Sequence, residues 1–186
     1  KRKYALGKTS GKANIKKNLQ ELGLTLNDED IKKVTKRIIE LGDKKERVIS
    51  EDLPFIISDV LNNYDFKKNI IIKSYELKHK KGLNPSAELE IIIKGELFKE
   101  SGSGDGQFNA FINAIKKIYT KNNIILPSLV DYTVTIPPGS SSDSLCETFI
   151  TWRNNNKDFI TRGLDSDQTV SAIKATEKML NIISNY

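Results

Sequence analysis

Two turns rich in glycine and aspartate have the clearest capacity for chemistry. The first, GSGDG (residues 102–106), and the second, RGLDSD (residues 162–167), each precede a run with helical spacing. N–H groups at a helix N-terminus lack partners within the helix, and the helix dipole favours negative charge there. Glycine also lets a ligand approach the backbone closely. Each turn therefore predicts a carboxylate site, with Asp105 or Asp167 near an ammonium group. The alternative is a pair of Asp helix caps with glycines for tight turns.

Nucleotide-binding patterns are excluded by their spacing. A dinucleotide fingerprint needs G-x-G-x-x-G after a strand, and its third glycine position falls on Gln107. The segment GKTSGKA, residues 7–13, is close to a P-loop, but only three residues separate its glycines and Ala13 follows the lysine. Neither segment therefore predicts a phosphate site.

Residues for catalysis or metal binding are scarce. The sequence has one histidine, His79, in a basic stretch expected to be a solvated turn, and one cysteine, Cys146, expected to be a buried thiol in a strand. This pair cannot form a zinc-ligand cluster, and one cysteine cannot close an internal disulfide. We therefore predict no catalytic residue, no metal ligand and a reducing, cytoplasmic location.

The net charge of +6 lies mostly at the start of the chain. Residues 1–17 carry seven cations and no anion, whereas residues 69–186 are nearly neutral. A basic segment can bind nucleic acid, but here Tyr4 is its only aromatic residue. A solvated or interdomain surface is favoured, and nucleic-acid binding stays the alternative. No apolar run is long enough to span a bilayer, so no membrane partner is expected.

The periodicity changes near residue 68. Apolar residues recur at helical spacing in segments 14–22, 27–42 and 50–61, with Asn27 and Ser50 as expected N-caps and Gly23 and Gly42 as expected ends. These segments predict a small helical subdomain, residues 1–68. Alternating apolar and polar residues then begin the second domain, residues 69–186.

The second domain contains an internal repeat of strands, a glycine turn and a helix. The first copy has expected strands at 69–77 and 87–98 and a helix at 106–119. In the second copy, we expect strands at 129–136, 145–153 and 157–163, then a helix at 166–184. The polar segment PPGSSSD, residues 137–143, separates two of these strands. The predicted fold class is α+β.

These segments resemble, in order, the C-terminal part of the α-isopropylmalate synthase family, which includes citramalate synthases. YALGKTSGKANIKKNLQELGL, a stretch ending in ELGDKK, and VISEDL are similar to the family's linker subdomain. GSGDGQFNA, LVDYTV and RGLDSDQTVSA are similar to its regulatory domain. The motifs are spread over nearly all of the 186 residues.

The resemblance implies a regulatory domain of two βββα units, paired across a homodimer, that binds the pathway's end-product amino acid near the dimer interface. It also implies an N-terminal catalytic barrel that condenses acetyl-CoA with a 2-oxo acid at a divalent metal. This chain has no room for that barrel, so we expect no cofactor in it and no activity from it alone. We expect leucine as the effector, or isoleucine as the alternative; the expected partners are this effector, a second copy and the barrel.

The family's effector-binding motifs match defined positions here. The segment LVDYTV, residues 129–134, contains Asp131 and Tyr132, is called the D-Y strand, and opens the second repeat. The second turn is the less certain contributor to effector binding. The residues carried over are Gly104, Asp105, Gly106, Gln107, Phe108, Asn109, Ala110, Leu129, Tyr132, Asp165, Ser166, Asp167 and Thr169. Many relatives have Pro at Gln107 and Asp at Asn109, so pocket shape and polarity can differ. Relatives also commonly have His where this chain has Thr9. A dimerisation domain without any ligand is the alternative from another functional class.

Overall fold

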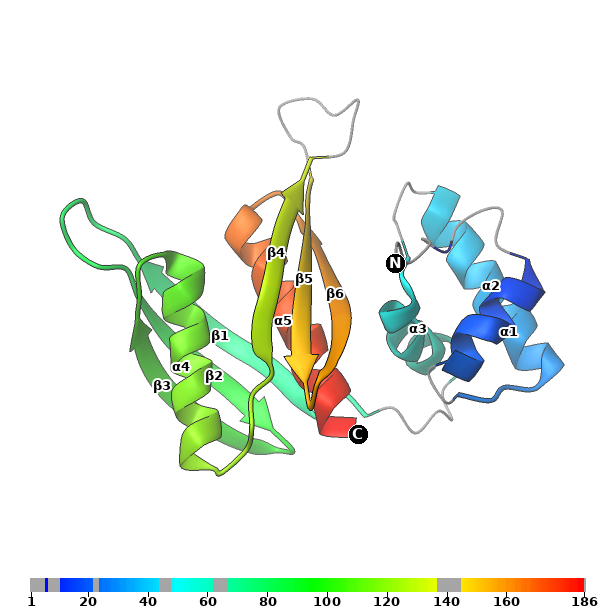
Figure 1. Ribbon diagram of the computed structural model, residues 1–186, viewed down its shortest axis with the longest axis horizontal. Helices are drawn as coiled ribbons and strands as arrows, with labels where there is room; N and C mark the ends of the chain where they lie inside the picture. Colours follow the sequence, from blue (N-terminus) through cyan, green and yellow to red (C-terminus); the bar gives the residue numbers. More distant parts are fainter. Residues whose placement is uncertain are drawn as a thin grey trace. The chain divides into compact units, whose positions relative to one another are not determined.

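The chain forms two compact units, Lys1–Lys67 and Lys68–Tyr186, in a computed structural model (Figure 1). The structure describes residue 6 and residues 11–21, 24–43, 48–61, 67–136 and 145–185. Gly23, Thr9 and the PPGSSSD segment lie outside the described residues, as does most of GKTSGKA. Within the described residues, no helix is long and apolar enough to cross a membrane.

The first unit is helical, as its apolar periodicity predicts. Its elements are α1 (Lys12–Glu21), α2 (Asp28–Asp43), the short 3-10 helix η1 (Ser50–Asp52) and α3 (Leu53–Val60). Asn27 caps α2 as expected, because its Oδ1 accepts the Asp30 N–H at 2.8 Å. The expected end at Gly42 is one residue early, since α2 runs to Asp43. Ser50 is not an N-cap: its hydroxyl donates to the Asn18 side chain at 2.6 Å, and the N-cap of η1 is Ile49.

The second unit contains two βββα repeats, which confirms the α+β class. The first repeat comprises β1 (Ile70–Lys78), β2 (Ser86–Ile93), β3 (Glu96–Ser103) and α4 (Gln107–Lys121). The second comprises β4 (Ser128–Thr135), β5 (Cys146–Asn154), β6 (Lys157–Asp165) and α5 (Gln168–Asn185). Each repeat forms its own antiparallel sheet, in the order β1-β2-β3 or β4-β5-β6.

The expected single strand at 87–98 is wrong, because it is a hairpin. Lys94 and Gly95 form its two-residue turn, and both have positive φ (49° and 91°). The equivalent turn in the second repeat is Asn155-Asn156, with φ of 47° and 61°. Two-residue hairpin turns of this kind need left-handed backbone at both positions, which glycine and asparagine adopt most readily. Lys94 lacks this preference, so its turn carries a weaker signal.

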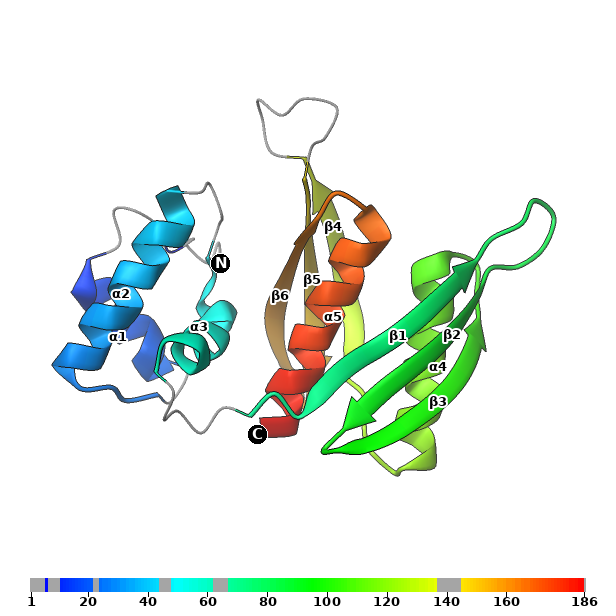
Figure 2. The same cartoon turned by 180° about the vertical axis from the view of Figure 1, so that it is seen from behind.

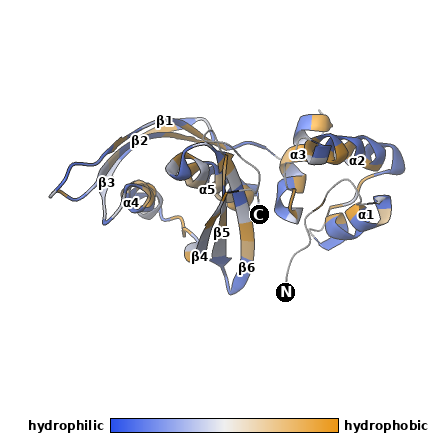
Figure 3. Ribbon diagram, turned by 90° about the horizontal axis from the view of Figure 1, so that it is seen from above, coloured by the Kyte–Doolittle hydropathy of each residue, from blue (hydrophilic) through white to orange (hydrophobic). Residues whose placement is uncertain are grey.

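One hydrophobic core unites the two repeats. Helix α4 packs on β2 and β3, whereas α5 lies between β1 and the strands β5 and β6 (Figures 2 and 3). Trp152 is buried in this core, and its indole N–H donates to the Thr161 hydroxyl at 2.8 Å. The packing holds the start of each helix beside a strand of the other repeat, where the expected site residues lie.

Candidate functional site

The first glycine turn uses its glycines for different purposes. A Cβ at Gly102 would lie 2.3 Å from the backbone oxygen of Ala110, so this glycine allows α4 to pack closely on β3. A Cβ at Gly104 would lie 2.1 Å from Asn109 Oδ1. Around Gly106 there is open space within 4 Å. Two of the three glycines therefore serve packing, and only Gly106 leaves room for a ligand.

Helix α4 begins without a side-chain cap. Gly106 is its N-cap, with extended backbone, and its carbonyl accepts the Ala110 N–H at 2.9 Å. Among the described residues, no acceptor meets the preceding N–H groups of Gln107, Phe108 and Asn109. Gln107, where the resemblance leads one to expect proline, thus adds a backbone donor. These donors point toward the place where a carboxylate would be most favourable.

Asn109 stabilises the first turn through hydrogen bonds to its side-chain oxygen. Its Oδ1 accepts the Asp105 N–H at 3.3 Å and an Asn113 side-chain N–H at 3.4 Å. An aspartate, the residue that the resemblance leads one to expect here, would accept the same two hydrogen bonds, so Asn109 is compatible with the same turn. Asp105 itself is exposed beside the turn.

The D-Y strand meets the start of α4. The rings of Phe108 and Tyr132 lie 5.5 Å apart between centroids, at an interplanar angle of 38°. Both side chains are partly buried, and Leu129 on the same strand is 42% exposed. The structure thus brings together two of the expected groups, the first turn and the D-Y strand, around an apolar surface next to free N–H donors.

The second turn has its donors occupied. The Oδ1 of Asp167 accepts the N–H groups of Thr169 at 2.7 Å and Val170 at 2.9 Å, so Asp167 caps α5. The Lys174 ammonium, 2.7 Å from Asp165, holds the pKa of that carboxyl below its usual value. A carboxylate ligand would meet two acids here, and the expected effector role of Asp165, Ser166, Asp167 and Thr169 stays a prediction.

Tyr75 is a further aromatic residue that the sequence did not single out. It lies on β1 at the position that corresponds to Tyr132 on β4, because both strands have a bulge two residues earlier. Its ring makes an edge contact with Phe111 at 6.0 Å. Burial, together with the charges of Asp165 and Asp167, raises its pKa. The signal that could have found it is the matching tyrosine in each repeat's first strand.

His79 and Cys146 lie outside the first turn. His79 is exposed in the connection between β1 and β2, as expected for a solvated residue. Cys146 is partly buried rather than fully buried, because it opens β5 at the edge of the second turn. Its thiol donates to the Ser166 carbonyl, with 3.8 Å between the heavy atoms.

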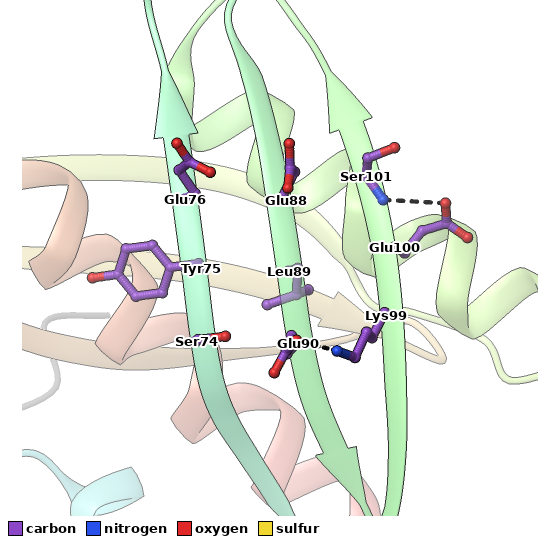
Figure 4. Close-up of a pocket in the computed structure, with 9 residues that line it drawn as sticks. All are labelled: Ser74, Tyr75, Glu76, Glu88, Leu89, Glu90, Lys99, Glu100 and Ser101. Atoms are coloured by element: carbon purple, nitrogen blue, oxygen red, sulfur yellow. Dashed lines mark hydrogen bonds and ion pairs between the residues drawn. The ribbon is translucent and has the colours of Figure 1, made fainter.

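A hollow of about 630 Å³ lies over the first sheet (Figure 4). None of the expected site residues lines it. Its charged lining consists of the carboxylates of Glu76, Glu88, Glu90 and Glu100 and the ammonium of Lys99. Each of these carboxylates is paired with a lysine, Glu76 and Glu88 with Lys78, Glu90 with Lys99 and Glu100 with Lys121, so the hollow has no unpaired lysine in its lining. It therefore suits an amino acid's carboxylate poorly.

Comparisons with known proteins cover nearly the whole chain with two families, whose boundary at residues 46 and 47 lies inside the first unit. Residues 47–184 match the family described as the LeuA allosteric (dimerisation) domain, and residues 1–46 match a homocitrate synthase post-HMGL domain-like family. A 2-isopropylmalate synthase from Aquifex aeolicus is 27% identical over 96% of this chain and 34% of its own length. A putative (R)-citramalate synthase from Archaeoglobus fulgidus is 30% identical over 98% of this chain and 37% of its own length. The chain spans about a third of these relatives.

Proposed function

The chain belongs to the LeuA allosteric (dimerisation) domain family, and from this premise we propose that it is the linker and regulatory part of a 2-isopropylmalate synthase. In this proposal the second unit binds leucine, the end product, within a cytoplasmic homodimer. Leucine binding biases a catalytic barrel, elsewhere in the full-length protein, through the helical unit. The barrel condenses acetyl-CoA with 2-oxoisovalerate and holds the divalent metal, so this chain is inactive alone.

The uncapped start of α4 is the observation that carries the proposal. The backbone donors of Gln107, Phe108 and Asn109 suit the effector's carboxylate. Phe108, Leu129 and Tyr132 offer an apolar surface for its side chain. Asp105, exposed beside them, provides a negative charge for the ammonium group. A zwitterion with an apolar side chain thus matches all three kinds of group.

A citramalate synthase regulator that senses isoleucine is the second candidate. It is supported by the 30% identity to the putative citramalate synthase from Archaeoglobus fulgidus, which is slightly higher than the 27% identity to the 2-isopropylmalate synthase from Aquifex aeolicus. An apolar pocket separates such isomeric side chains by only about 1–3 kcal/mol. Leucine is the first choice because the allosteric domain family takes its description from LeuA.

Thermal melting with leucine, isoleucine, valine or a non-branched amino acid tests the proposal. A ligand at a hundred times its Kd adds roughly 2.7 kcal/mol to the free energy of unfolding, so the expected result is a selective rise with leucine. A selective rise with isoleucine would identify the citramalate alternative. No rise with any amino acid would contradict effector binding and leave a dimerisation domain whose turns are only caps.

A further inference from the structure

The side chain of Asn113, one helical turn beyond Asn109 in α4, holds the first turn. Asn113 donates to the Ser103 carbonyl at 2.8 Å and to Asn109 Oδ1 at 3.4 Å. Asn109 in turn accepts the Asp105 N–H at 3.3 Å. Ser103 is thus bound by Asn113 directly, and Asp105 is bound to it through Asn109. One side chain therefore fixes the backbone on both sides of Gly104.

Gly104 itself takes part in the same network. Its N–H donates to the Pro85 carbonyl at 3.1 Å. A side chain at Gly104 would fill the space that Asn109 Oδ1 occupies. Each of the residues 103–105 therefore has a backbone group in a hydrogen bond that belongs to the turn. These bonds give the turn a defined conformation, which sets the place from which the Asp105 side chain extends.

The second repeat has a lysine at the equivalent position. Counted from the N-cap of each helix, Asn113 of α4 corresponds to Lys174 of α5. Lys174 donates to the Leu164 carbonyl at 3.2 Å, as Asn113 does to the equivalent Ser103 carbonyl. The Lys174 ammonium also lies 2.7 Å from the Asp165 carboxylate. The second repeat therefore keeps the bond to the third strand and adds a positive charge that pairs with the acid of its turn.

The acid of the first turn has no such counter-charge. Asp105 is exposed, and among the described residues no lysine or arginine forms an ion pair with it. The next two side chains on this face of α4 are lysines that bind β3 elsewhere, Lys117 at the Ser101 carbonyl and Lys121 at Glu100. A neutral side chain thus holds the first turn, whereas a cation holds the second.

We propose that Asn113 is a positioning and specificity-determining residue of the effector site: it holds the first turn without a charge, which leaves the Asp105 carboxylate for the effector's ammonium group. This inference rests on the proposed function for the presence of an amino-acid effector, and it adds the residue that makes the turn select an ammonium. A lysine at this position would hold the same carbonyl, because an ammonium has three donors. It would also repel the effector's ammonium and attract a carboxylate.

Asn113→Lys tests the proposal with two ligands, leucine and 4-methylpentanoate, which is leucine without its ammonium group. Calorimetric titration is expected to give a Kd about threefold higher for leucine and about threefold lower for 4-methylpentanoate, the size of effect that an exposed charge pair produces. A role in holding the turn alone would move both affinities in the same direction. Any result in which the two Kd values do not move in opposite directions would overturn the proposal.

Thr120→Lys is the matched control for charge. It adds the same ammonium at an exposed position of α4, two helical turns after Asn113. The helix rise places it about 10 Å further from the first turn, where charges are largely screened at physiological ionic strength. Both Kd values should stay unchanged in this variant. A shift equal to that of Asn113→Lys would show an effect of net charge and would contradict a specific role for Asn113.

Amide exchange at Asp105, measured by NMR, tests the positioning without a ligand. Asn113→Ala removes the bonds to Ser103 and Asn109, so the Asp105 N–H should exchange several-fold faster. Lys117→Ala removes the corresponding bond one helical turn later and is the control, in which Asp105 should exchange as before. Alanine favours a helix more than asparagine does, and circular dichroism checks that α4 is retained. Unchanged exchange in Asn113→Ala would remove the positioning role.

The outcomes separate this inference from the proposed function. Leucine binding that Asn113→Lys weakens in step with 4-methylpentanoate binding keeps the effector and removes the selective role of Asn113. An unmodified chain that binds no amino acid, with exchange at Asp105 that still depends on Asn113, removes the proposed function. It also reduces Asn113 to a residue that only stabilises the turn.

Discussion

The two βββα repeats share one design. Gly102 of β3 and Gly163 of β6 each face the backbone of their helix, Ala110 and Ala114 in the first repeat and Ser171 and Ala175 in the second. Both hairpins turn through a pair of residues with positive φ. In both repeats a helix side chain, from Asn113 or Lys174, bonds to the last carbonyls of the third strand. The internal repeat is therefore present in the structure as well as in the sequence.

The repeats differ where each helix begins. Gly106 and Asp167 occupy the same position, the N-cap, but only Asp167 has a side chain to accept the first N–H groups. In the first repeat, no cap side chain accepts the first N–H groups of α4, so these groups can bind another acceptor. In the second repeat, the Asp167 carboxylate accepts them. One residue type at one position thus separates a turn suited to a ligand from a turn that is a cap.

The largest loss of stability is expected at a feature that both repeats share, the glycine that faces the backbone of the helix. In Gly163→Val, a Cβ would lie 1.7 Å from the Ser171 carbonyl oxygen, so the helix must move away from the sheet. We expect a loss of more than about 3 kcal/mol in the free energy of unfolding, measured by denaturant titration. Gly106→Val is the matched control, because its Cβ meets open space; an equal loss there would show that the two glycines are not distinguished by packing.

A smaller effect is expected from the hydrogen bonds between the Asn181 side chain of α5 and the backbone of Ile70 in β1, which join the two repeats. Asn181→Leu leaves the buried N–H and C=O of Ile70 without their side-chain partner, which should cost about 2 kcal/mol of unfolding free energy. Thr120 holds the corresponding position in α4 and is exposed, so Thr120→Val should be nearly neutral. Hydrogen exchange at Ile70 should be faster in Asn181→Leu. Unchanged exchange would contradict the covering role of α5.

The smallest effect is a pH dependence from Glu177. Burial raises the pKa of this carboxyl, against the opposing hydrogen bond from Ile72, so the folded protein favours the protonated form. Its contribution to stability is present below its ordinary pKa of 4.5 and is lost as the pH rises through the raised value. Glu177→Gln keeps an acceptor for Ile72 and should stabilise the protein at pH 7 but not at acid pH. Exposed Lys116 of α4, changed to Gln, is the control; the same pH profile in both variants would exclude Glu177 as the source.

The sequence predicts elements better than it predicts the differences between them. Helical spacing and alternation place the helices and most strands, because burial of one face sets those patterns. The hairpin at Lys94 and Gly95 was missed because a run of isoleucines continues up to it. Ser50 was a wrong cap because its hydroxyl bonds to Asn18, a residue 32 positions away whose proximity no local pattern reveals.

The candidate site shows the same limit. Its motifs identify the first turn and the D-Y strand, and the contact of Phe108 with Tyr132 agrees with that grouping. The alternative of paired Asp caps holds only for Asp167, since Asp105 stands one residue before the N-cap. A shift of one residue decides which N–H groups a carboxylate can reach, and the helix start is the boundary that sequence patterns define least well.

Calorimetric titration of leucine into three forms of the chain tests the central claim most directly. The unmodified chain should bind leucine, and Asp167→Gly should bind it with similar affinity. Gly106→Asp adds a cap carboxylate in open space, competes for the donors of α4 and should weaken binding at least about tenfold, or about 1.4 kcal/mol. Unchanged binding by Gly106→Asp, or loss of binding in Asp167→Gly, would contradict the assignment of the effector to the first turn.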